Sequence, residues 1–87
     1  MKKIWKFVVD KESVEITAPI TQFLTAQING GKITVWAEVN TNNTPLNYEL
    51  RTFETNEEIS DSNYSYLGTI QDVGGLLVLH IYYKQIV

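Results

Sequence analysis

Two alternating segments on either side of Asn29-Gly30 constrain the fold of this chain more than any other feature. In residues 23–28 and 33–39, every second residue is apolar, which is the period of a half-buried strand. Asn-Gly between two such runs indicates a tight β-hairpin, because it supplies the positive φ values that the turn requires. We therefore predict an antiparallel hairpin here.

The same period of two recurs along the rest of the chain. It predicts further strands over residues 4–9, 13–17, 46–55, 64–71 and 76–83. No window of 11 or more residues shows a convincing helical period, and the acidic segment 56–63 is predicted as a loop or a single helical turn. We expect an all-β fold, or a β-rich α+β fold. Its form would be a small antiparallel sandwich or a partly closed barrel of about six strands.

Composition narrows the possible functions. The 87 residues fit one domain, residues 1–87, and the net charge of −3 argues against direct DNA or RNA binding. The absence of cysteine and the single histidine argue against thiolate or multi-histidine metal sites, and we expect no metal and no cofactor. No apolar run reaches 18 residues and no secretory signal is apparent, so we expect no membrane contact and a cytoplasmic protein.

Four residues are candidates for a ligand-binding or partner-binding site. Trp36 shares its strand face with polar residues, so it is either an exposed anchor for a partner or is covered by another strand. Arg51 is the only arginine; it either binds a carboxylate or phosphate of a ligand, or pairs with a glutamate of the chain. His80 and Tyr82 share a strand face, and His80 is either a ligand contact or a satisfied, half-buried side chain.

The densest charge cluster is acidic. It comprises Glu54, Glu57, Glu58 and Asp61. Its spacing matches no calcium-binding loop, so a solvated loop is the simplest interpretation. The alternative is a negative contact loop that occupies a basic groove on a partner. Gly68, Gly74 and Gly75 lack the spacing of a phosphate-binding loop and are predicted to serve turns or bulges.

The order of motifs resembles an uncharacterised family of short proteins found mostly in bacteriophage and prophage genomes. The motifs are Lys3-Ile4-Trp5-Lys6-Phe7, Asn29-Gly30, Val35-Trp36-Ala37, Arg51-Thr52-Phe53, Tyr66-Leu67-Gly68-Thr69-Ile70-Gln71, Gly74-Gly75 and Val78-Leu79-His80-Ile81. A Gly-Thr-Gly-His stretch is usual in that family, and Glu54-Thr55-Asn56-Glu57 stands in its place here. The resemblance implies a phage accessory protein, acting in the cytoplasm of the bacterial host, and implies no reaction.

Two functions from different classes follow as hypotheses. The first is a stoichiometric binder, not an enzyme, that inhibits a bacterial defence system by blocking an effector protein or sequestering its nucleotide signal. The alternative is a small enzyme that degrades such a signal, with His80 and a carboxylate as the acid–base pair. A minor virion component is a third possibility. We also expect a homo-oligomer, because residues 76–87 carry only Lys84 as a full charge to protect a sheet edge.

Overall fold

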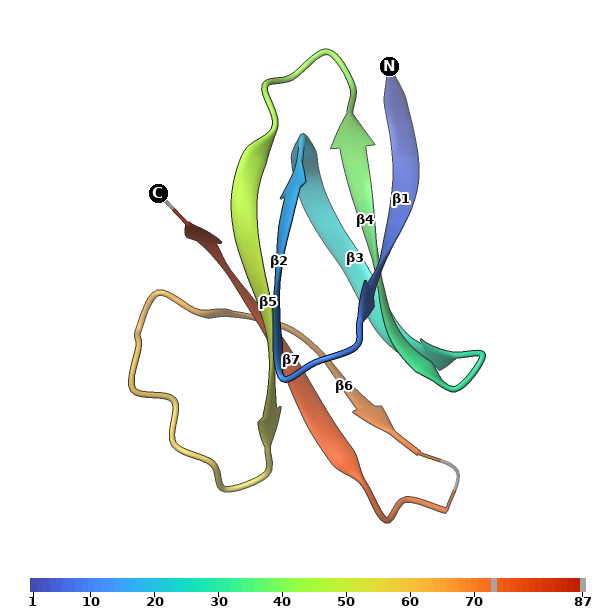
Figure 1. Ribbon diagram of the computed structural model, residues 1–87, viewed down its shortest axis with the longest axis vertical. Helices are drawn as coiled ribbons and strands as arrows, with labels where there is room; N and C mark the ends of the chain where they lie inside the picture. Colours follow the sequence, from blue (N-terminus) through green and yellow to red (C-terminus); the bar gives the residue numbers. More distant parts are fainter. Residues whose placement is uncertain (73, 87) are drawn as a thin grey trace.

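Seven strands form the fold in the computed structural model, which describes residues 1–72 and 74–86. They are β1 (Lys2–Val9), β2 (Ser13–Ala18), β3 (Ile20–Asn29), β4 (Lys32–Asn40), β5 (Leu46–Glu54), β6 (Ser65–Gln71) and β7 (Val78–Ile86). Figure 1 shows their arrangement. The all-β prediction is confirmed, with seven strands where about six were expected. The described residues contain no helix, so segment 56–63 is a loop and not a helical turn.

The strands form two antiparallel sheets that pack face to face (Figure 1). The first has three strands in the order β1-β4-β3, and the second has four in the order β2-β5-β7-β6. The sheets are not joined into a closed barrel, so of the two forms predicted the sandwich is correct. The last strand, β7, lies between β5 and β6 and is not an edge. The reasoning that led from an exposed terminal edge to an oligomer is therefore wrong, although the oligomer itself stays a prediction.

The predicted hairpin is β3–β4, but its turn differs by one residue from the prediction. Asn29 pairs with Lys32 as the last pair of the ladder, so the two turn residues are Gly30 and Gly31. Both have positive φ, 60° and 79°, as a two-residue turn of this kind requires. Asn29 therefore ends the strand, and the second glycine supplies the conformation that we assigned to the asparagine.

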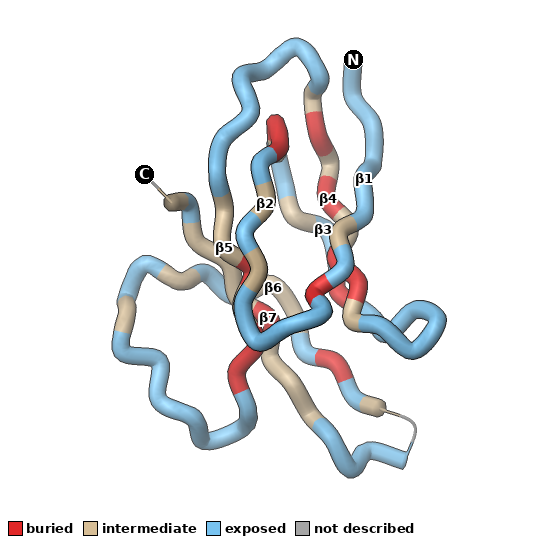
Figure 2. The backbone as a smooth tube through the Cα atoms, viewed as in Figure 1, coloured by how far each residue is buried: buried red, intermediate tan, exposed pale blue. Residues whose placement is uncertain are grey.

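The core lies between the inner faces of the two sheets (Figure 2). The central strands supply its most deeply buried side chains: Val35, Ala37 and Val39 of β4, Leu50 of β5 and Ile81 of β7 are all 0% exposed. Central strands are covered on both edges and on their inner face, and this explains why their alternating apolar residues are the most buried. By contrast, Trp5 lies on edge strand β1 and is 38% exposed.

Turns and bulges account for the remaining glycines discussed above. Gly68 follows a register shift between β6 and β7, and Gly74 and Gly75 have positive φ in the β6–β7 turn. The bulge and turn assignments are thus confirmed. Val73, which the prediction placed in the same turn, lies outside the described residues.

Candidate functional site

Three of the four predicted site residues share the outer face of the four-stranded sheet. Arg51 of β5 lies directly opposite Tyr82 of β7, and His80 lies opposite Phe53. Side chains at directly paired positions point to the same face of a sheet. Trp36 does not join them, because it lies on the outer face of the other sheet, between its register partners Lys6 and Thr25. Trp36 and Arg51 are therefore on opposite sides of the sandwich.

Arg51 is bonded to carboxylates of its own chain. Its Nη2 donates to Glu57 Oε2 at 3.2 Å and to Glu12 Oε1 at 3.3 Å, and its guanidinium lies 4.5 Å from the centre of the Phe53 ring. Its Nε is buried and has no hydrogen-bond partner. The predicted glutamate pairing is observed, and both of these bonds are made by Nη2.

A second charged group lies beside Arg51 on the same face. Glu49 accepts hydrogen bonds from the hydroxyls of Ser13 and Tyr64, and Lys84 donates to Asp61 at 2.8 Å. Burial raises the pKa of Glu49, but the two hydroxyl bonds and the nearby cations outweigh it, so the net pKa lies below its ordinary value. The bond from Lys84 lowers the pKa of Asp61 in the same way. These groups are charged and paired at neutral pH.

Both ring nitrogens of His80 are within hydrogen-bond distance of a threonine hydroxyl. Nε2 lies 2.9 Å from Thr55 Oγ1, and Nδ1 lies 3.0 Å from Thr69 Oγ1. The ring is half-buried, as the simpler of the two interpretations predicted. Tyr82, its neighbour on the face, makes edge-to-face contacts with Phe53 and Tyr66 at centroid distances of 5.4 and 5.5 Å.

The acidic loop between β5 and β6 is held against this face by two of its four predicted contact residues. Glu57 pairs with Arg51 and Asp61 pairs with Lys84, while Glu54 and Glu58 are exposed. Among the described residues, no group of three or more acidic or histidine side chains is arranged to hold a metal ion. The part of the chain that the structure describes also contains no helix that could cross a membrane.

Two small hollows open on this face. One, of about 250 Å³, is lined by Arg51 and Lys84, and the other, of about 230 Å³, by His80 and Tyr82. Both are smaller than the roughly 300–1,000 Å³ of typical small-molecule sites. The predicted residues thus form a packed, internally bonded surface.

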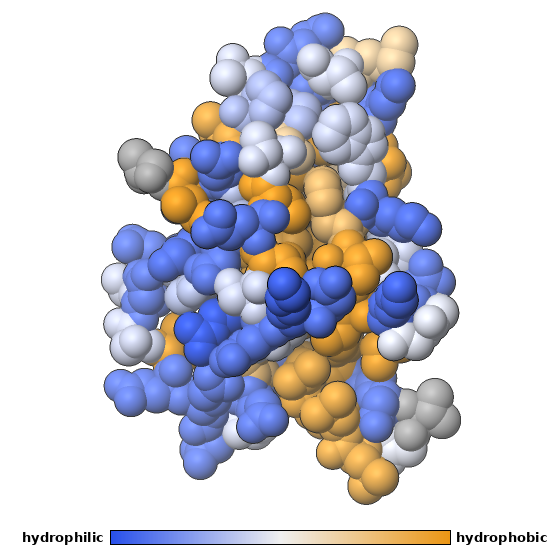
Figure 3. Space-filling model, in the orientation of Figure 1, coloured by the Kyte–Doolittle hydropathy of each residue, from blue (hydrophilic) through white to orange (hydrophobic). Residues whose placement is uncertain are grey.

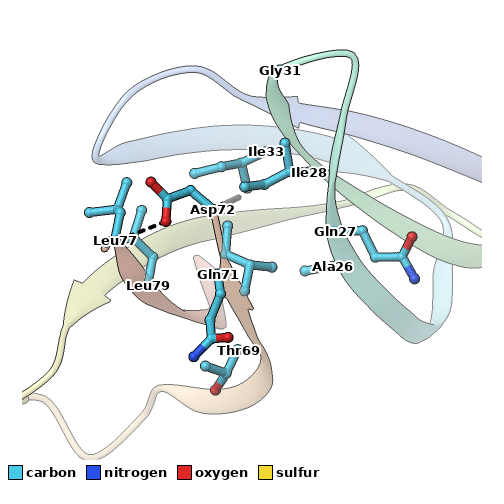
Figure 4. Close-up of a pocket in the computed structure, with 11 residues that line it drawn as sticks. Ala26, Gln27, Ile28, Gly31, Ile33, Thr69, Gln71, Asp72, Leu77 and Leu79 are labelled. Atoms are coloured by element: carbon cyan, nitrogen blue, oxygen red, sulfur yellow. Dashed lines mark hydrogen bonds between the residues drawn. The ribbon is translucent and has the colours of Figure 1, made fainter. Parts of the chain in front are cut away.

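A much larger depression lies elsewhere, between the β3–β4 hairpin and the end of the β6–β7 hairpin. We call it the groove, and its volume is about 850 Å³. Its apolar lining residues are Ala26, Ile28, Ile33, Ile70, Leu77 and Leu79. Figure 4 shows Ile28 and Ile33 of the β3–β4 hairpin on one side and Leu77 and Leu79 on the other, with Asp72 between them. In Figure 3, apolar side chains form a continuous band toward the end of the β6–β7 hairpin, while the side of the acidic loop is hydrophilic.

The groove forms because the two sheets diverge from a close contact. Gly68 of β6 lies against Ala26 of β3, where a Cβ added to the glycine would be 3.8 Å from the Ala26 backbone nitrogen. From there β3 and β6 run on without pairing to each other. The side chains beyond the contact point are left partly uncovered: Ile28 is 41% exposed and Leu77 is 47% exposed.

Comparison with known proteins identifies the family. A model described as a domain of unknown function, DUF7352, matches residues 1–86. The chain belongs to this DUF7352 family. No curated protein and no solved structure matches it. The expectation of an uncharacterised family is therefore confirmed.

Sequence reasoning missed the groove of this DUF7352 domain. Its residues come from two hairpins that are about 40 positions apart in the chain, and each reads as an ordinary alternating strand. The one available signal was Leu76-Leu77, two apolar residues directly after the glycine turn Gly74-Gly75, where a polar turn is usual. Leu76 is 94% exposed, and a turn alone gives no reason for a leucine at so exposed a position.

Proposed function

We propose that this DUF7352 protein is a stoichiometric binding protein of bacteriophage origin that inhibits a bacterial defence protein in the host cytoplasm. We further propose that the groove is its contact surface. The phage context comes from the sequence resemblance, and the observation that carries the binding role is the groove itself. Its volume of about 850 Å³ lies within the roughly 300–1,000 Å³ of typical binding pockets, and most of its lining is apolar.

The exposed surface area supports a partner. The chain exposes 5702 Å², whereas roughly 5,200 Å² is expected for a monomeric protein of this mass. The excess is consistent with the uncovered side chains around the groove, among them Leu76, Leu77 and Ile28. Burying such apolar side chains on binding yields about 25 cal/mol per Å² before the costs of association.

The geometry favours an extended protein segment as the occupant. The groove lies between two edge strands, β3 and β6, and the sequences of both strands carry no charged residue. An extended segment could bond to the free backbone groups of one edge and place alternate apolar side chains in the groove. This is the effector-blocking form of the hypothesis.

The nucleotide-sequestering form has less support. A nucleotide needs a cation for its phosphate and a flat ring for its base. Among the described residues, the groove lining contains neither, and its one charged residue is Asp72. Arg51 is bonded to two glutamates, and Trp36 lies on the opposite side of the sandwich from it. An enzyme that uses His80 would first have to break its bonds to Thr55 and Thr69.

The test uses groove variants with a matched control. Ile28→Asp and Leu77→Asp place a charge in the groove, while Leu46→Asp makes the same change at a similarly exposed residue, 42%, outside it. Each protein is expressed in bacterial strains that carry different defence systems, and the plating efficiency of a sensitive phage is measured. We expect wild type and Leu46→Asp to restore plating in at least one strain, and both groove variants to fail.

Purified components then separate the two classes of function. With the defence effector from that strain, inhibition should saturate at one equivalent of the protein. Full inhibition at a hundredth of an equivalent would indicate turnover and contradict the binding role. Groove variants that protect the phage as well as wild type would rule out the groove, and failure of wild type in every strain would contradict the inhibitor role.

A further inference from the structure

A second surface lies along the free edge of β1. Strand β1 is the edge of the three-stranded sheet opposite to β3, and β2, which follows it, pairs with β5 in the other sheet. Figure 1 shows the first half of β1 at the outside of the sandwich, with β4 on one side only. Its backbone groups are therefore available to a further strand.

The hydrogen-bond register identifies which backbone groups are free. Thr41 N donates to Met1 O at 3.0 Å across the β1–β4 ladder. Hydrogen-bonded pairs alternate with non-bonded pairs in an antiparallel ladder, so odd-numbered residues of β1 bond to β4. The N–H and C=O groups of Lys2, Ile4, Lys6 and Val8 consequently face the open edge.

Charge is strongly segregated toward this edge. Of the seven lysines and arginines, five lie on β1 or beside its end: Lys2, Lys3, Lys6, Lys11 and Lys32. Eight of the ten acidic residues belong to the four-stranded sheet and the segments that adjoin it: Glu12, Glu15, Glu49, Glu54, Glu57, Glu58, Asp61 and Asp72. The remaining two, Asp10 and Glu38, lie next to β1, and Glu38 Oε1 is 3.7 Å from Lys2 Nζ. Lysines still outnumber acids at this edge of a chain whose net charge is −3.

The same edge exposes apolar side chains between its lysines. Ile4 is 65% exposed and Val8 is 41% exposed, and they alternate with Lys2 and Lys6 on the outer face. A strand that paired with β1 would meet the order Lys, Ile, Lys, Val on that face. The complementary strand carries acidic and apolar residues in the same alternation.

The lysines also argue against pairing of β1 with the β1 strand of a second copy of the chain. If two copies of the chain paired antiparallel through β1, Lys2 and Lys6 of one strand would lie directly opposite or diagonally next to the lysines of the other. Like charges at such positions on adjacent strands are destabilising. An acidic segment reverses the sign of each contact. We infer that the free edge of β1 binds an extended acidic segment of a partner protein by strand addition, with glutamate or aspartate opposite Lys2 and Lys6 and apolar residues opposite Ile4 and Val8.

The test uses a blocked synthetic peptide with the sequence Thr-Val-Thr-Glu-Thr-Val-Thr-Glu, which places its acidic and apolar residues in this alternation. Binding is followed by titration on the full chain, with amide hydrogen exchange measured by NMR. We expect saturable binding that weakens as salt is raised, and slower exchange at the amides of Lys2, Ile4, Lys6 and Val8. A peptide with lysine in place of glutamate should not bind.

Two further comparisons separate strand addition from simple charge attraction. The first is a peptide in which every second backbone amide, on the side that would pair with β1, is N-methylated. This removes the peptide's hydrogen-bond donors and leaves the protein unchanged, so it should abolish binding. Lys6→Gln should weaken binding by about 1.5- to 5-fold, the range for an exposed ion pair. Gln85→Glu, which lowers the net charge equally on the other sheet, should leave binding unchanged.

Several results would overturn the inference. The first two are failure of the acidic peptide to bind and equally tight binding of the lysine peptide. The others are binding of the N-methylated peptide as tightly as the unmodified one, and amide exchange that slows only outside β1. Since the groove lies at the opposite edge of the sheet, the outcome is independent of the function proposed above.

Discussion

Replacing Arg51 by alanine tests whether this residue binds a partner or stabilises the fold. From the sequence alone, we expect Arg51→Ala to abolish partner binding and to leave stability nearly intact. The structure predicts the opposite for stability. The side chain is 30% exposed, bridges Glu12 and Glu57, and covers Phe53, which is 3% exposed.

The magnitude follows from the separate contacts. The ion pair with Glu57, whose side chain is 32% exposed, contributes about 0.5 kcal/mol after screening, and the pair with Glu12, 70% exposed, contributes little. The contact with the Phe53 ring adds about 0.5–1 kcal/mol, and the aliphatic stem adds a similar amount by covering the ring. We therefore expect Arg51→Ala to lower the free energy of unfolding by about 1.5–2.5 kcal/mol. For a domain of this size that lowers Tm by about 6–20 °C.

Arg51→Met is the matched control because it keeps most of the stem. Like alanine, it removes the buried Nε, which has no hydrogen-bond partner, so the two variants differ mainly in the stem. We expect its loss of stability to be about 0.5–1 kcal/mol smaller than that of alanine, because the stem is the contact that methionine keeps and alanine loses, as measured by urea unfolding of all three proteins. An Arg51→Ala protein that melts within 2 °C of wild type would refute this reasoning and favour a side chain free to reach a ligand.

Two further predictions concern the core and the charged face. Leu50→Ala removes a side chain that is 0% exposed, so it should lower the free energy of unfolding by about 2–5 kcal/mol; a urea midpoint that hardly moves would show that the inner faces pack differently. Glu49→Gln should lower stability at pH 7. Because the pKa of Glu49 is depressed in the folded state, the stability that its charge provides is present above its ordinary value of 4.5 and is lost as the pH falls through the lower folded value. The difference from wild type should therefore shrink in urea unfolding at pH 3, and an equal difference at both pH values would contradict it.

The fold was largely predictable because strand alternation is a local property. In β5, the split between Tyr48, Leu50 and Thr52 on one face and Glu49, Arg51 and Phe53 on the other is the one that the sequence predicts. What local pattern does not give is strand order. Residues 76–86 read as an edge because they carry few charges, whereas β7 carries few charges because it is paired on both sides.

The site was less predictable, for the same reason. Arg51, His80 and Tyr82 share a face because β5 and β7 are neighbours, and no local pattern shows which strands are neighbours. The alternation correctly places Trp36 on the opposite face of its strand from Val35 and Ala37, but it does not show to which sheet the strand belongs. The partners that hold His80, Thr55 and Thr69, lie 25 and 11 positions away in the chain and have no recognisable motif.

The four sheet edges of this protein differ in a way that connects the two proposed surfaces. Natural sheets protect exposed edges with lysines, bulges or short strands. Strand β1 carries three lysines, and β2 has only six residues with Glu15 among them. Strands β3 and β6 carry no charge, and their bulges lie before the part that faces the groove. At the Gly68–Ala26 contact these two edges protect each other, but beyond it they separate around apolar side chains. The basic edge therefore admits only a partner of opposite charge, whereas the uncharged pair of edges admits a partner on shape and apolar contact alone.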